Sequence, residues 1–210
     1  WQIASLQSFI MRPSSQLYDD LQHAMATSGL AHALARGDPV VGLHVRHGDS
    51  CRPPEMARSR RRCDPLSSYM AAVRRLTTAV NISTIYLATD SPTVLAQTKS
   101  YPEYTFLHFA DALAFNQASN PDNRKWDDVV RKNRLSANFS QNARLAWLTT
   151  LDVMMLSRCS LFVGKHTSDF FRTAYELRAA GCDCAPPFVS LDAPWCFDWG
   201  TAAGVNPSLP

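Results

Sequence analysis

The sequence VVGLHVR, residues 40–46, decides the fold class of this chain. It is a short apolar run that follows an Arg-Gly-Asp-Pro turn, and such a run predicts a strand buried inside a sheet. Runs of the same kind occur at 84–89, 104–109 and 160–164, and a shorter one at 188–191. We expect these segments to form one sheet.

Helical patterns lie between the predicted strands. The expected helices are 15–34, in which Gly29 would allow a break, then 65–80, 92–99, 141–158 and 167–180, the last one ending at Gly181. Strands that alternate with helices favour parallel strands joined by right-handed crossovers. We therefore expect an α/β fold, a Rossmann-like parallel sheet with flanking helices.

The expected domain organisation is a helical lead-in at 1–36, the sheet domain at 37–195 and a tail at 196–210. A polar stretch at 116–138 is expected to be a lid or disordered. The chain begins at Trp1 rather than Met. We expect a fragment or a processed product, in which missing targeting signals prove nothing.

Composition excludes several classes of protein. The 210 residues are 46% hydrophobic and 19% charged, which is ordinary for a globular domain. The formal net charge of +3 is too small to favour a nucleic-acid partner. No stretch approaches about 18 uncharged apolar residues, so we expect no membrane segment in this chain.

Six cysteines bear on the compartment: Cys51, Cys63, Cys159, Cys182, Cys184 and Cys196. An even number is compatible with up to three disulfides and an oxidising lumen. Zinc is the alternative, but paired CxxC units are absent from the sequence and a single CxC is weak support. N-x-S sequons at Asn81 and Asn138 agree with secretion.

Ligands of open parallel sheets bind at the carboxyl ends of the strands. The polar residues at those ends are His44, Arg46, His47 and Asp49 after the first strand, Asp90 after the second, and Lys165, His166, Thr167 and Ser168 after the fourth. A helix starting at 167–168 offers free N–H groups to an anion. With the fork of an Arg side chain, it could hold a diphosphate without metal. Walker A and GxGxxG sequences are absent, which disfavours P-loop and dinucleotide folds.

Plainer interpretations stand beside these. Arg46 could pair with a carboxylate for structural reasons. His44 and His47 have the spacing of metal ligands but lack a recognisable third. Asp152 lies in an apolar stretch, so its carboxylate must be paired or hydrogen-bonded. No GxSxG sequence is present, which disfavours a hydrolase.

The segment HVRHGD, residues 44–49, resembles a motif of the α1,6-fucosyltransferases, glycosyltransferase family 23. This family includes the animal core N-glycan enzyme and the rhizobial chitooligosaccharide enzyme. Further matches follow in order: YLATDSP at 86–92, YPEY at 101–104, Leu-Asp at 151–152 and FVSLD at 188–192. Together the matches extend over roughly residues 1–197.

The resemblance implies the nucleotide-sugar half of a GT-B-like, inverting, metal-independent fucosyltransferase, with residues 37–195 binding GDP-fucose. Arg46 would grip the β-phosphate and stabilise departing GDP. His44 and Asp152 would contact guanine, and Ser168 a phosphate. The residues carried over as donor-binding are His44, Arg46, His47, Asp90, Asp152, Thr167 and Ser168, with Asp49 and Asp90 holding the motif loop in place.

The chain departs from the family pattern at several positions. His47 replaces the second Arg of the animal motif, as in the rhizobial pattern, and Ser50 replaces a Lys. The family's candidate general base has no clean match here, and Glu55 is the nearest carboxylate. Arg46, Asp49 and Glu55 are therefore the predicted catalytic residues. Asp169 places a negative charge near the phosphates.

The leading hypothesis is transfer of L-fucose from GDP-fucose to a glycan, α1,6 to the core GlcNAc of an N-glycan. The alternatives are a protein O-fucosyltransferase and a non-catalytic module that binds nucleotide sugars. We expect a location in the Golgi lumen, with an N-terminal membrane anchor outside this chain. The acceptor is expected to be a glycan or glycoprotein, and no metal or other cofactor is expected.

Overall fold

The architecture is a parallel sheet between two layers of helices. The structure, a computed structural model, describes residues 2–48, 51, 63–77, 82–119 and 139–192. Within this part of the chain, five parallel strands form one sheet in the order β3-β2-β1-β4-β5. The strands are β1 Val40–Val45, β2 Thr84–Thr89, β3 Thr105–Leu107, β4 Leu161–Gly164 and β5 Phe188–Ser190. The predicted fold class is confirmed.

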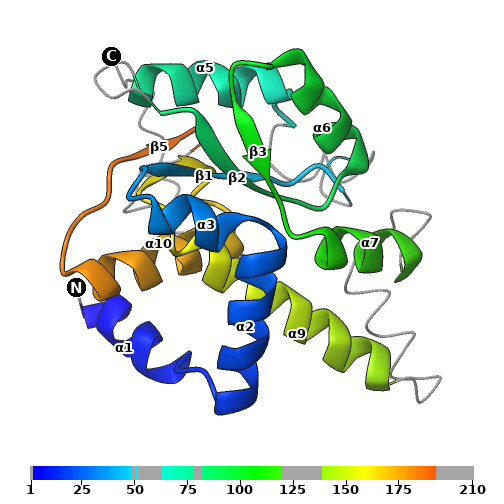
Figure 1. Ribbon diagram of the computed structural model, residues 1–210, viewed down its shortest axis with the longest axis vertical. Coiled ribbons are helices and arrows are strands. Elements are labelled where there is room, and N and C mark those ends of the chain that lie inside the picture. The colour runs from blue at the N-terminus through cyan, green and yellow to red at the C-terminus, as the bar shows by residue number, and fades with distance from the viewer. Residues whose placement is uncertain (1, 49–50, 52–62, 78–81, 120–138, 193–210) are drawn as a thin grey trace, which may run out of the picture.

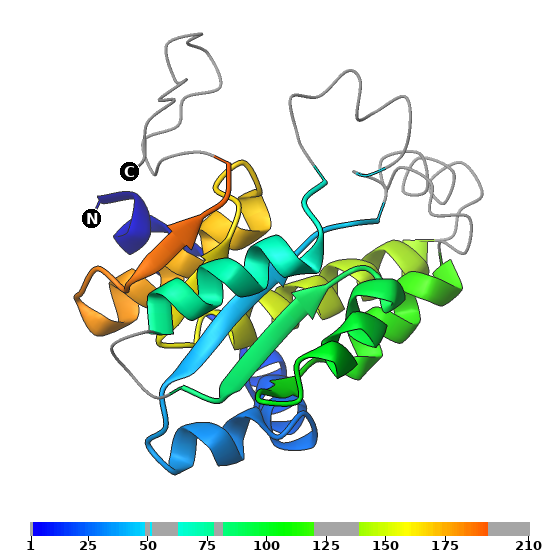
Figure 2. The same cartoon turned by 90° about the horizontal axis from the view of Figure 1, so that it is seen from above.

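Helices cover both faces of the sheet (Figures 1 and 2). On one face lie α5 Leu66–Thr77 and α6 Pro92–Gln97, followed by the short η2 Thr98–Ser100. On the other face lie α2 Ser15–Thr27, α3 Leu30–Ala35, α9 Phe139–Leu156 and α10 Asp169–Cys182. Helix α1 Gln2–Ile10 packs along α10, and α7 Ala110–Ser119 packs against α9.

The central strand β1 is buried along its whole length. Val41, Leu43 and Val45 contact the apolar layer under α5. Val40 faces the opposite layer, and by strand alternation His44 points to that same side. A strand enclosed on both faces has a near-continuous apolar sequence, which is why the run at 40–46 is so distinctive.

Gly42 allows the end of α9 to approach β1 closely. A Cβ at this position would lie 2.8 Å from Leu156 Cδ1 and 3.0 Å from Cys159 Cβ. The missing side chain of Gly42 therefore makes room for the turn that joins α9 to β4. Elsewhere, Gly29 has φ +81° and separates α2 from α3, so the break that the sequence allows at this glycine is present.

Two predicted boundaries are wrong. Helix α10 continues through Gly181 to Cys182, and Asp183 takes the left-handed conformation expected of Gly at φ 49°. The stretch predicted as a lid or disordered from residue 116 begins inside α7, because Ala112 and Leu113 bury one side of that helix. The remainder of the stretch lies outside the described residues.

Two disulfides join described cysteines, Cys51 to Cys63 and Cys182 to Cys184. Cys159 is a buried free thiol, so it does not contribute to the predicted maximum of three. The CxC pair considered for zinc is thus a disulfide, and Cys196 lies outside the described residues. None of the described helices is long and apolar enough to cross a membrane.

Replacing Gly42 by Ala is expected to destabilise the fold by about 1–3 kcal/mol, because α9 must move away from β1. Thermal unfolding followed by circular dichroism measures the change. Gly181→Ala is the matched control, since a Cβ there meets nothing within 4 Å in α10. Equal unfolding temperatures for the two variants would contradict close packing at Gly42.

Candidate functional site

A cavity of about 220 Å³ lies at the carboxyl ends of β1 and β2. Its lining comes from both strands and from α7, α9 and α10: His44, Arg46, Ala88, Thr89, Asp90, Ala112, Asn116, Leu145, Thr149, Asp152 and Phe170. The small side chain of Ala88 is directly beside His44 in the strand register. Four of the residues predicted to bind the donor therefore share one cavity: His44, Arg46, Asp90 and Asp152.

His44 is a neutral ring in this cavity. Its imidazole stacks on Phe170, with ring centroids 4.7 Å apart and planes 16° from parallel. Burial, and to a smaller degree the charge of Arg46, lowers the pKa of His44 to about 3. At neutral pH the ring therefore offers one N–H donor and one nitrogen acceptor, with no charge.

Asp90 fixes the backbone that carries Arg46. Its Oδ1 accepts hydrogen bonds from the N–H groups of His47 and Gly48, at 2.9 and 3.0 Å. Its Oδ2 lies 3.9 Å from Arg46 Nη1. The Arg46 side chain is 37% exposed and that of Asp90 only 11%. The Asp90 carboxylate thus accepts the backbone N–H groups of the loop, while the Arg46 guanidinium lines the cavity.

Asp152 is paired with a tyrosine of the sheet. The Tyr86 hydroxyl donates to Asp152 Oδ1 at 2.6 Å, and Tyr86 itself is fully buried. Burial raises the pKa of Asp152 to about 7, although the Tyr86 hydrogen bond acts in the opposite direction. The sequence-based requirement for a partner of this carboxylate is met.

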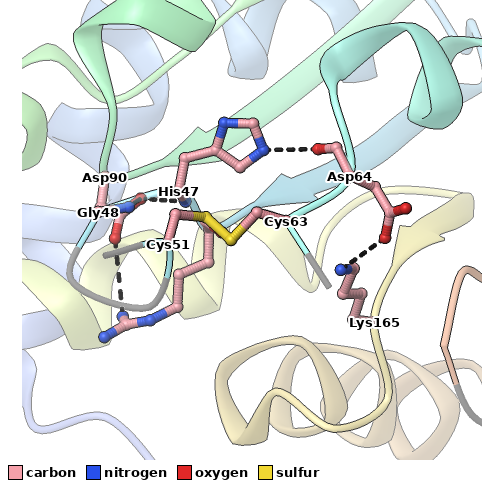
Figure 3. The surroundings of a disulfide bond; sticks show 8 residues. His47, Gly48, Cys51, Cys63, Asp64, Asp90 and Lys165 are labelled. Carbon is pink, nitrogen blue, oxygen red and sulfur yellow. Dashed lines mark hydrogen bonds and ion pairs between the residues drawn. A yellow bond between two sulfur atoms is a disulfide. The ribbon is translucent and has the colours of Figure 1, made fainter. Parts of the chain in front are cut away.

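Three of the predicted donor-binding residues do not line this cavity: His47, just after β1, and Thr167 and Ser168, after β4. His47 Nε2 bonds to the Asp64 carbonyl oxygen at 2.6 Å, so its ring points toward α5 (Figure 3). The Thr167 hydroxyl donates to Asp192. Ser168 is the N-cap residue of α10 and its side chain makes no capping hydrogen bond.

A family model described as Alpha-(1,6)-fucosyltransferase N- and catalytic domains matches residues 1–194. The chain belongs to this family. The resemblance found in its motifs is confirmed. Two similar solved structures are POFUT1 in complex with GDP, at 11% identity, and POFUT1 in complex with GDP-fucose, at 12%. Each match covers 90% of this chain, with a TM-score of 0.46. The chain spans about half the length of these proteins, 51% and 49%.

Two of the predicted catalytic residues of this fucosyltransferase-family chain, Asp49 and Glu55, lie outside the described residues. Arg46, the third, is placed in the cavity. The described residues contain no group of three His, Cys, Asp or Glu side chains arranged to hold a metal ion. His44 and His47, which have metal-ligand spacing, are directed to different partners.

Sequence reasoning missed the hydrogen-bond partner of Asp152, which is Tyr86, and part of the cavity wall. The strand and the motif that contain Tyr86 do not indicate this role, although a buried tyrosine needs a partner for its hydroxyl. Leu145, Thr149 and Asp152 recur at helical spacing along one side of α9. That spacing was a usable signal. Asn116 lies in α7, a helix that was not expected.

Tyr86→Phe is expected to raise the pKa of Asp152 above its value near 7, because the variant loses the donor that favours the carboxylate. Carbon-13 NMR titration of the labelled aspartate carboxyl groups measures this pKa. Tyr69→Phe is the control, since Tyr69 is buried in α5 on the opposite face of the sheet. An unchanged titration in Tyr86→Phe would refute the pairing.

Proposed function

We propose that this chain is the donor-binding part of a fucosyltransferase that transfers L-fucose from GDP-fucose to a glycan. The finer proposal is α1,6 transfer to the core GlcNAc of an N-glycan, with inversion and without a metal cofactor. Membership of the α1,6-fucosyltransferase family supports this proposal. The observation on which it rests is that Arg46 and Asp152, a cationic and an acidic residue, line one cavity.

The two ends of a nucleoside diphosphate need different partners. Tyr86, which holds Asp152, pairs in register with Gly42, four residues before Arg46 along β1. Asp152, on α9, is therefore held at the level of Gly42, whereas Arg46 lies just beyond the end of β1. Asp152 can accept hydrogen bonds from the guanine N1–H and N2–H groups, assisted by neutral His44, while Arg46 binds the diphosphate as a fork.

The proposed chemistry is displacement at the fucose anomeric carbon. An acceptor hydroxyl attacks, the bond to the GDP oxygen breaks, and Arg46 stabilises the charge that develops on the diphosphate. Ser168 and the free N–H groups at the start of α10 are proposed as a second phosphate contact. Thr167 is less suited to contact a phosphate, because its hydroxyl donates to Asp192 and an aspartate carboxylate repels an anion. Glu55 is the proposed base for the acceptor proton.

The proposed compartment is the Golgi lumen. The two disulfides among the described residues support an oxidising environment. A glycan or glycoprotein is the proposed acceptor.

We expect the folded chain to bind GDP in the micromolar range in the presence of EDTA, and Arg46→Ala to weaken this binding about tenfold or more. Isothermal titration calorimetry measures both constants. Arg36→Ala is the matched control, because Arg36 forms an exposed ion pair with Asp38 outside the cavity. A folded protein that binds no GDP, or binds it equally well without Arg46, would overturn the proposed donor site.

The affinity for GDP is expected to fall as the pH drops below about 7, by up to about tenfold per pH unit. The guanine N–H groups favour ionised Asp152, so bound nucleotide lowers the pKa of this carboxyl group and protonation opposes binding. Asp152→Asn is expected to bind GDP more weakly and to lose this part of the pH dependence. Titration of GDP itself is common to both proteins and cancels.

The control for this experiment is Asp19→Asn, which changes an exposed carboxylate of α2. It is expected to retain the wild-type affinity and pH profile. A wild-type profile in Asp152→Asn would show that this carboxylate does not contact the nucleotide.

A further inference from the structure

Asp64 joins two strand ends to the start of α5. Its carboxylate lies 2.7 Å from Lys165 Nζ, just after β4, and the two side chains are only 9% and 13% exposed. Its backbone carbonyl oxygen accepts from the His47 ring, just after β1, at 2.6 Å. A buried pair of this kind is costly to break from one side, so it favours a single arrangement of these segments.

A covalent link reinforces the same junction. Cys63 directly precedes Asp64 and forms a disulfide with Cys51. The Cys51 N–H donates to the Gly48 carbonyl oxygen at 3.3 Å, and Cys51 Sγ lies 3.8 Å from the Arg46 carbonyl oxygen. Figure 3 shows the disulfide between the His47–Gly48 backbone and Asp64.

The turn that follows β1 is therefore held from two sides. Asp90, just after β2, accepts hydrogen bonds from the backbone N–H groups of this turn. Asp64 and the disulfide hold it from the start of α5. Asp90 is in ion-pair range of Arg46, whereas Asp64 and the cysteines act on the backbone and on the neighbouring His47.

We propose that Asp64 and the Cys51–Cys63 disulfide are a positioning unit for Arg46, so that donor affinity depends on the oxidised state of this disulfide. The inference rests on the proposed function, because it assigns Arg46 to the diphosphate. It also assigns His47 a role that its sequence position did not suggest. The His47 ring anchors the turn to Asp64 instead of binding a phosphate.

The chain contains its own control in the second disulfide. Cys182 and Cys184 are two residues apart at the end of α10, and Cys182 Sγ lies near the Ala179 carbonyl oxygen of the same helix. Neither cysteine lines the cavity. Loss of this disulfide tests the general effect of removing a crosslink.

The experiment compares Cys51→Ser/Cys63→Ser with Cys182→Ser/Cys184→Ser, each as the full chain and below its unfolding temperature. Amide hydrogen exchange reports the turn without any ligand. In the first variant we expect faster exchange at His47 and Gly48 with unchanged protection at Tyr86, and a Kd for GDP raised about tenfold or more. In the second variant we expect wild-type exchange at these amides and a Kd within about twofold of wild type.

A second measurement covers the case in which the serine variant does not fold. In the Cys182→Ser/Cys184→Ser protein, dithiothreitol reduces the Cys51–Cys63 disulfide. It supplies two electrons and two protons, leaves two thiols and becomes a cyclic disulfide. We expect the GDP affinity of the folded sample to fall on reduction and to recover on reoxidation.

Wild-type exchange at His47 and Gly48 after loss of the disulfide would overturn the positioning role, whatever the ligand result. Faster exchange with an unchanged Kd would overturn the link to the donor. If the wild-type protein binds no GDP, the proposed function fails and the donor part of this inference fails with it. Hydrogen exchange still decides the positioning of the turn.

Discussion

The burial of β1 on both faces is the constraint on which the rest of the structure depends. Because successive side chains point to opposite faces, the strand must satisfy two helical layers at once. Valines and a leucine meet the layer under α5, while Gly42 and His44 face α9 and α10. On the face toward α9 and α10, the strand has a glycine and a histidine where large apolar residues would otherwise stand. Gly42 allows the end of α9 to pack closely against β1. His44 lines the polar cavity at the carboxyl end of β1.

Charge in the cavity is arranged by what surrounds each group. His44 has an apolar ring against it and a cation nearby, so it stays neutral. Asp152 is buried but has a phenol donor, which leaves its pKa near neutrality rather than far above it. Arg46 remains partly exposed and keeps its charge. The cavity thus contains the cation of Arg46, the neutral ring of His44 and the carboxyl group of Asp152, whose pKa lies near neutral pH. This set of groups suits a ligand with a charged end and a polar aromatic end.

The sequence was sufficient to predict the sheet, because the apolar runs 40–46 and 84–89 are short, rich in β-branched residues and bounded by turn residues, which favours a buried strand over a buried helix. It also indicated that His44, Arg46 and Asp90 would meet, since parallel strands end at one edge. The directions of the side chains at these strand ends could not be predicted from the sequence. The His47 side chain points away from the cavity because its ring N–H donates a hydrogen bond to the carbonyl oxygen of Asp64, 17 residues later. Thr167 turns to Asp192, 25 residues later, for the same kind of reason. Such long-range partners leave no local pattern.

Cys159 has a consequence for how the chain keeps its disulfides. The thiol is enclosed beside Gly42, and burial raises its pKa far above the ordinary range. A thiolate is the form of cysteine that attacks a disulfide bond, so the native sheet keeps this sulfur from exchanging with the two disulfides of the described residues. Both of those pairs close over short sequence separations, of 12 and 2 residues. Pairing within these two disulfides therefore needs little long-range order, whereas Cys159 is shielded from exchange once the core around it has formed.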